Sequence, residues 1–396
     1  MSDYVGTVVR GLKAPIFKKK DDVVAMVTDL LLSASKHEGF DINDHDVLGI
    51  TEAVVARTQG NYATIDHIAA DVASKFGNHT IGVVFPILSR NRFSMLLKGI
   101  AKAATKVVLL LSYPSDEVGN HLVSWDALDE LGINPTSDLL TLQKYRELFQ
   151  YPVHEFTNVD YVAYYQEIIE QQGAECEIIF ANDPRKILDY TKHVLCCDIH
   201  TRHRSKRLLK KANAELVLGL DDLLTQSVDG SGYNPDYGLL GSNLATDNSV
   251  KLFPKEGQHV VDAIQQQVLE KTGKLIEVLI YGDGAFKDPQ GKIWELADPV
   301  VSPAFTKGLI GQPNELKLKY LADNEFSNLS GEALKQAIIQ KIHDKQASSL
   351  NQGNRLGTTP RQMSDLIGSL CDLTSGSGDK GTPIVYIQGY FDNYAK

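Results

Sequence analysis

The segment from Thr374 to Pro383 has the composition of a loop that could bind phosphate. Its glycines allow the backbone to approach an anion closely, its hydroxyl groups can donate hydrogen bonds, and its lysine adds positive charge. The residues concerned are Ser375, Gly376, Ser377, Gly378, Asp379, Lys380, Gly381 and Thr382. Their spacing differs from the Walker pattern of glycines and lysine. A phosphate-binding loop and a solvent-exposed connection between a helix and a strand therefore remain alternative interpretations.

Asp283 and Glu256 are candidate ligands for a divalent metal ion. Asp283 follows the apolar run at residues 275–280, and Glu256 precedes a helical pattern that starts at residue 258. An aspartate at the carboxyl end of a buried strand can bind a hard cation through its carboxylate oxygens. Asp283 could instead hydrogen-bond to its own backbone in a turn, and Glu256 could stabilise the dipole of the helix that follows it.

A dense group of cysteines and histidines lies near the middle of the chain. Its spacing does not match a zinc finger, so buried cysteines on a strand followed by solvated histidines are the simpler interpretation. The group consists of Cys196, Cys197, Asp198, His200 and His203. Basic residues between 202 and 211 follow it. They could contact an anionic substrate or RNA, but they are more typical of a solvated helix face.

Alternating strand and helix patterns must position these residues. In the first 77 residues, strands are predicted at 5–9 and 46–50 and helices at 21–35 and 64–75. From 78 to 225, predicted strands at 82–85, 107–111, 176–180, 193–198 and 215–218 alternate with helices at 93–104, 160–172 and 183–190. After a polar stretch at 225–248, helices at 258–271 and 360–373 precede strands at 275–281 and 384–387. The pattern predicts an α+β protein in which residues 78–225 form an inserted α/β domain.

Composition excludes several classes of protein. The 396 residues suffice for two or three cores, and 43% hydrophobic with 23% charged residues is ordinary for a globular protein. The longest apolar runs are far shorter than the roughly 20 residues that span a bilayer. A net charge of −10 disfavours nucleic acid as a partner. Four cysteines are too few for a disulfide framework, and no signal peptide is evident, so we expect a cytoplasmic protein.

Several segments, taken in order, resemble the coenzyme F-420 (deazaflavin) γ-glutamyl ligase family. They are residues 8–12, 46–60, 243–250, 269–274 and 365–389. Residues 54–60 are similar to the family's Val-Val-Ser-Lys-x-Glu-Gly motif, and residues 243–250 are similar to its Asn-x-Gly-x-Asp-x-Ser-Asn loop. The resemblance implies a split ligase-like domain of residues 1–77 and 226–396 around the insertion at 78–225. It also implies a homodimer.

The resemblance further implies an enzyme that uses GTP and Mn²⁺ or Mg²⁺ to add glutamate, or a similar amino acid, to a small-molecule carboxylate. Glu256 and Asp283 would then hold the metal. The nucleotide would contact Arg10, Gly11, Leu12, Arg57, Ser375, Gly376, Ser377, Gly378, Asp379, Lys380 and Gly381. Ser375 and Ser377 stand where the family has an acidic or amide metal ligand. A non-catalytic protein that binds a small anion or a nucleotide on the same fold is therefore the alternative.

Overall fold

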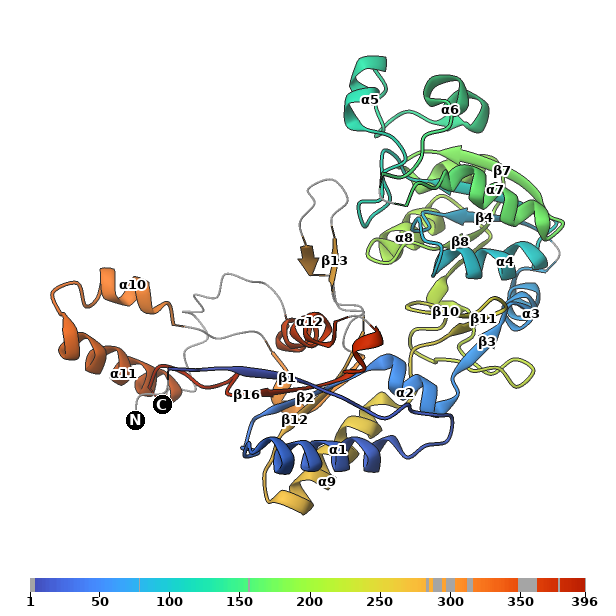
Figure 1. Ribbon diagram of the computed structural model, residues 1–396. Coiled ribbons are helices and arrows are strands. Elements are labelled where there is room, and N and C mark those ends of the chain that lie inside the picture. Colours follow the sequence, from blue (N-terminus) through green and yellow to red (C-terminus); the bar gives the residue numbers. More distant parts are fainter. Residues whose placement is uncertain are drawn as a thin grey trace.

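The computed structural model is a mixed α/β protein with several sheets (Figure 1). It describes residues 4–77, 79–155, 157–282, 285–287, 294–296, 303–311, 316–347, 362–376 and 378–395. None of the helices in these ranges is both long and apolar enough to cross a membrane. The mixed α/β class predicted from the sequence is confirmed, whereas the limits of the inserted and split domains stay a prediction.

A five-stranded sheet takes its strands from segments far apart in the sequence. Its spatial order is β1 (Val8–Leu12), β16 (Ile384–Gln388), β2 (Val47–Thr51), β12 (Glu277–Tyr281) and β15 (Ala304–Phe305). Strands β2 and β12 are parallel, and β16 is antiparallel to both β1 and β2. The predicted strands at 46–50, 275–281 and 384–387 are confirmed, with limits that differ by one or two residues.

Successive side chains of these strands pack on opposite faces of the sheet. On one face, Leu48 and Ile50 of β2 join a core with α1 (Val23–Glu38) and α9 (Gly257–Thr272). On the other, Val47 packs in a core with α12 (Met363–Ser375). Figure 1 shows α1 and α9 on one side of the sheet and α12 on the other. Because both faces are covered, the strands are nearly continuous apolar runs.

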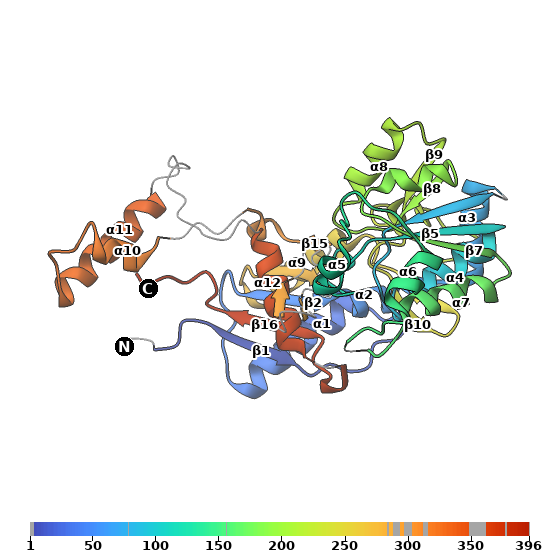
Figure 2. The same ribbon diagram turned by 90° about the horizontal axis from the view of Figure 1, so that it is seen from above.

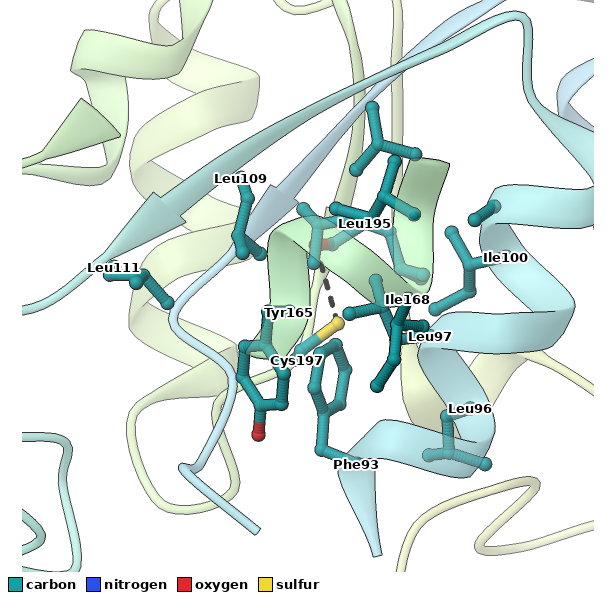
Figure 3. Packing of buried hydrophobic residues seen from close by; sticks show 14 of the residues in the cluster. Phe93, Leu96, Leu97, Ile100, Leu109, Leu111, Tyr165, Ile168, Leu195 and Cys197 are labelled. Carbon is teal, nitrogen blue, oxygen red and sulfur yellow. Dashed lines mark hydrogen bonds between the residues drawn. The ribbon is translucent and has the colours of Figure 1, made fainter. Parts of the chain in front are cut away.

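A six-stranded sheet is built from residues 80–219 alone. Its order is β6 (Leu140–Thr141), β7 (Glu175–Phe180), β5 (Lys106–Leu111), β4 (Thr80–Val84), β8 (His193–Cys196) and β9 (Leu216–Gly219). All adjacent pairs are parallel except β6 with β7, which is antiparallel. One face packs against α3 (Ile65–Phe76), α4 (Phe93–Ala103) and α7 (Tyr161–Gln171), and the other against α8 (Arg202–Lys211). Figure 3 shows the first of these cores, where Phe93 and Tyr165 surround Cys197.

The remaining elements are shorter. A three-stranded antiparallel sheet joins β10 (Asn243–Thr246), β11 (Ser249–Lys251) and β3 (Tyr62–Thr64), and β13 (Ala285–Lys287) pairs with β14 (Trp294–Leu296). The further helices are α2 (Glu52–Gln59), α5 (Trp125–Leu131), α6 (Leu142–Phe149), α10 (Leu318–Asp323) and α11 (Gly331–Ala347). Both views place α10 and α11 at the end of the molecule opposite the six-stranded sheet (Figures 1 and 2).

Two predicted helices differ from those observed. The segment predicted at 183–190 is a 3₁₀ helix at Pro184–Asp189. The helix predicted at 360–373 is α12, which begins at Met363, and Gln362 precedes it without a side-chain capping bond. Residues 360 and 361, the start of the predicted helix, lie outside the described residues.

Candidate functional site

A cleft of about 1270 Å³ opens at one edge of the five-stranded sheet. Most of its lining comes from four segments, which are the loop after β1, the junction of β2 and α2, the β10–β11 hairpin, and the connection between α12 and β16. The charged residues in its lining are Lys18, Lys19, Arg57, Lys251 and Asp372. The hairpin and the β1 loop also give it an apolar wall, which includes Leu244 and Ile16.

Strand direction explains why segments far apart in sequence meet here. Parallel pairing of β2 with β12 places their carboxyl ends side by side, with Thr51 opposite Tyr281. Because β16 runs antiparallel, its first residue, Ile384, lies opposite Ile50 and also opposite Leu12 at the end of β1. The connections that leave these strand ends therefore converge at one edge, which is where open α/β sheets commonly bind ligands.

The glycine-rich connection after α12 leaves part of its backbone bare toward the cleft. Gly376 ends α12 with φ +65°, and Gly381 has φ +69°, conformations that favour glycine. A Cβ atom at Gly378 or Gly381 would meet no atom within 4 Å. Gly376, Gly378 and Gly381 all line the cleft, as the sequence interpretation of a ligand-binding loop requires.

The polar side chains of this connection hydrogen-bond within it. The Ser375 hydroxyl donates to the Asp372 carbonyl at 2.8 Å, and the Lys380 ammonium donates to the Thr374 carbonyl at 3.1 Å. Thr382 Oγ1 donates to the Ser375 carbonyl at 2.9 Å. These bonds fix the loop, so its backbone is the part best placed for a ligand. Asp379 does not line the cleft, and Ser377 lies outside the described residues.

The first turn of α2 adds a positive helix end to the cleft. Thr51 precedes α2 without a side-chain capping bond, and Ala53 and Val54 line the cleft. A helix amino terminus attracts anions through its free backbone N–H groups and its dipole. Arg57, in the last turn of α2, is exposed and also lines the cleft. This edge of the sheet is therefore suited to an anion.

The predicted residues of β1 have other positions. The Arg10 guanidinium donates to Gln388 and stacks over the Phe40 ring at 4.5 Å from its centroid. Leu12 is buried in the core shared with α1 and α9. A Cβ atom on Gly11 would lie 3.1 Å from Cβ of Thr382, so the absence of a side chain there permits close packing beside the cleft. None of the three residues lines the cleft.

The structure describes only one of the two predicted metal ligands. Asp283 lies outside the described residues. Glu256 is exposed, has φ +53°, and immediately precedes α9 without a side-chain capping bond; it does not line the cleft. Across the ranges that the structure describes, no group of three or more histidine, cysteine or acidic side chains could hold a metal ion.

The cysteine and histidine group forms no metal centre among these residues. Cys196 and Cys197 are buried at the end of β8, and burial raises the pKa of both thiols. His200 lies just before α8, and His203 lies in its first turn. A thiol with a raised pKa is a weak metal ligand because the thiolate is the form that binds.

Two buried ionisable groups, Glu52 and Tyr281, lie beside the cleft. Glu52, the first residue of α2, is 4% exposed, and burial raises its pKa although Lys251 and Arg92 act in the opposite direction. Tyr281 donates a hydrogen bond of 2.9 Å to the Pro383 carbonyl, and burial raises its pKa. The tyrosine hydroxyl therefore stays protonated and ties β12 to the start of β16.

A comparison with protein-family models shows which family the chain belongs to. The model for F420-0:gamma-glutamyl ligase matches residues 11–389. The chain belongs to the F420-0:gamma-glutamyl ligase family. The match covers nearly the whole chain and confirms the resemblance found in the sequence. A search of curated proteins found no match.

Membership of the F420-0:gamma-glutamyl ligase family makes the chain a ligase enzyme and implies small-molecule substrates. The structure adds cleft residues that sequence reasoning missed. Lys18 and Lys19 belong to a run of three lysines that could have been noticed. Lys251, Asp372 and Asn91 carry no such local signal, because tertiary packing alone brings them to the cleft.

Proposed function

We propose that the cleft is the active site of a ligase that uses GTP and a divalent metal ion to add glutamate, or a similar amino acid, to a small-molecule carboxylate. The observation that carries the proposal is the convergence of a glycine-rich loop, a helix amino terminus and exposed cations in one cleft. Its volume of about 1270 Å³ exceeds the roughly 300–1,000 Å³ of single-ligand pockets. It has room for a nucleotide together with an acceptor.

The proposed reaction has two steps. An oxygen of the acceptor carboxylate attacks the γ-phosphorus of GTP, the bond to the β-phosphate breaks, and an acyl phosphate and GDP form. The amine of glutamate then attacks the acyl carbon, inorganic phosphate leaves with the electrons of the carbon–oxygen bond, and the nitrogen loses a proton. Both steps concentrate negative charge on phosphoryl oxygens, which fixed cations and N–H dipoles stabilise.

The chain supplies such groups on several sides of the cleft. Lys18, Lys19 and Arg57 are exposed cations that can contact phosphate oxygens, and the backbone of the 376–381 loop can approach them. Asp372 is a cleft-lining carboxylate beside this loop. Mg²⁺ commonly binds to one or two carboxylates together with substrate phosphates, so Asp372 fits a metal held partly by GTP. When bound, the metal would neutralise phosphate charge.

The remaining predictions belong to the same proposal. We propose that Glu256 and Asp283 are further metal ligands, that residues 1–77 and 226–396 form the split ligase-like domain, and that the enzyme is a homodimer. The family resemblance supports each of these points.

Calorimetric titration tests nucleotide and metal binding directly. Wild-type protein is expected to bind GTP more tightly than ATP, and only with Mg²⁺ or Mn²⁺. Asp372→Asn is expected to weaken metal-dependent GTP binding about tenfold, because a neutral amide is a poorer ligand for a hard cation. Glu130→Gln, on exposed α5, makes the same change in net charge and should bind as wild type.

Glu256→Gln and Asp283→Asn, titrated in the same way, examine the two ligands predicted from the sequence. If the wild type binds neither nucleotide with any metal, the ligase proposal is wrong. If it binds GTP but releases no phosphate with F420-0 and glutamate, a non-catalytic nucleotide-binding protein is favoured instead.

Gly378→Ala probes the bare backbone of the loop. The new methyl group would meet no protein atom within 4 Å, so the free energy of unfolding should hardly change. The methyl would occupy space that a phosphate needs, and we expect GTP to bind about tenfold more weakly. Gly6→Ala is the matched control, because its Cβ also meets no atom within 4 Å and Gly6 does not line the cleft. Unchanged GTP affinity in Gly378→Ala would contradict a phosphate site at this loop.

A further inference from the structure

Lys251 brings to the cleft a positive charge that is held more firmly than the other cations there. Its Nζ atom lies 2.6 Å from Oε1 of Glu52, and the two side chains are only 12% and 5% exposed. Lys251 lines the cleft, whereas Glu52 lies behind it. Lys18, Lys19 and Arg57, by contrast, are exposed. The ammonium group of Lys251 therefore lies between a buried carboxylate and the cleft.

The backbone on both sides of Lys251 is also fixed. Lys251 is the last residue of β11 and pairs with Tyr62 of β3. The N–H of Leu252, the next residue, donates to the Asn61 carbonyl at 3.0 Å. Strand pairing and the ion pair together leave this side chain little freedom, so little conformational entropy remains to be lost when it meets a ligand.

Glu52 depends on Lys251 for compensation of its charge. Its second oxygen, Oε2, is buried and has no hydrogen-bond partner among the described residues. Arg92 contributes a smaller favourable electrostatic effect, and it also interacts electrostatically with Asp372 on the cleft wall. A buried carboxylate with so few partners holds its cation tightly, because removal of that cation would leave an uncompensated charge in the interior.

The ion pair adjoins the elements that would bind phosphate. Thr51, the residue before Glu52, donates its backbone N–H to the Pro383 carbonyl at 3.0 Å. This bond connects the start of α2 to the end of the glycine-rich connection. Lys251, the amino terminus of α2 and the glycine-rich loop therefore border the same part of the cleft.

We propose that Lys251 contacts the phosphoryl group during its transfer, and that Glu52 is a positioning residue that holds the Lys251 ammonium in place. The inference rests on the proposed ligase function. A charge that is fixed before the reaction stabilises developing charge without reorganisation, whereas a flexible cation mainly assists binding. Lys251 therefore affects the rate of transfer, and the exposed lysines affect the affinity for GTP.

The test compares phosphate release and GTP binding in variants that keep the interior neutral. Phosphate release is measured with GTP, Mn²⁺, F420-0 and L-glutamate, and GTP affinity by calorimetry. In Glu52→Gln with Lys251→Gln, neither side chain carries a charge, so the protein should fold. We expect its kcat to fall about 100-fold and its Kd for GTP to change less than about threefold. Glu52→Gln alone keeps the ammonium but loosens it, and should lower kcat about tenfold.

Lys36→Gln, at an exposed position in the last turn of α1 outside the cleft, is the matched control for loss of one lysine charge, and it should leave both kcat and the Kd for GTP unchanged. Lys251→Arg in the wild-type background should retain more activity than the neutral double variant, since it keeps the charge. Wild-type turnover together with an unchanged kcat in the double variant would overturn the inference and leave the ligase function intact. A wild type that neither binds GTP nor releases phosphate would overturn both.

Discussion

Replacing Arg57 with methionine is expected to lower ligase activity about 100-fold while the free energy of unfolding changes by less than about 1 kcal/mol. The Arg57 side chain is exposed on the last turn of α2 and lines the cleft. Its loss therefore creates no cavity. Hydrogen bonds from a guanidinium to a phosphate contribute about 1.5–3 kcal/mol each, and a 100-fold loss corresponds to about 2.7 kcal/mol, the contribution of one or two such bonds.

The measurement is kcat/KM for phosphate release, with thermal unfolding as the check on stability. Arg57→Lys should recover part of the activity, because a lysine keeps the positive charge but cannot make the bidentate hydrogen bonds of the guanidinium. Arg204→Met removes an exposed arginine from α8 and serves as the control. If the two methionine variants were equally active, Arg57 would have no role in the reaction. Loss of activity in Arg204→Met alone would instead favour a functional basic face on α8.

Gly49→Val is expected to destabilise the protein by at least about 3 kcal/mol. Gly49 lies in β2, and a Cβ atom there would be 2.4 Å from Sγ of Cys371 and 3.3 Å from Cδ1 of Tyr281. Both neighbours are almost completely buried, so neither can move aside without disturbing the core between the sheet and α12. Chemical denaturation, followed by circular dichroism, measures the change.

A double-mutant comparison identifies the cause of that instability. Once Cys371→Ala has removed the sulfur, the nearest atom to a Cβ on Gly49 would be 3.3 Å away. Gly49→Ala should then cost less than about 1 kcal/mol in the Cys371→Ala protein but clearly more in the wild type. Equal costs in the two backgrounds would show that contact with Sγ is not the source.

Local pattern predicted the elements well where burial is continuous. Residues 107–111 and 384–387 are apolar runs of strand length, and both are strands buried on two faces. The sequence pattern predicts no element between 112 and 160, although this region contains α5 and α6. These helices have seven and eight residues, so their apolar periodicity is too short to recognise.

Only those cleft residues whose own segment has a recognisable composition or a family resemblance could be predicted from the sequence. Arg57 and the glycines at 376, 378 and 381 were recognised from local composition and family resemblance, and the structure places them in the same cleft. Lys251 was missed because its importance arises from an ion pair with Glu52, which lies 199 residues away in the sequence. Arg10 was predicted only because residues 8–12 resemble a segment of the family; in the structure its guanidinium donates to Gln388 and stacks over Phe40.

The position of β16 determines when during synthesis the cleft can exist. This strand, the last that the structure describes, lies between β1 and β2 in the five-stranded sheet. The six-stranded sheet uses residues 80–219 alone, so it can form while later residues are still being added. A nascent chain without residues 384–388 leaves the edges of β1 and β2 unpaired, and such edges favour aggregation. Residues 384–388 must therefore leave the ribosome before the cleft can form, and until then chaperones can bind the unpaired edges of β1 and β2.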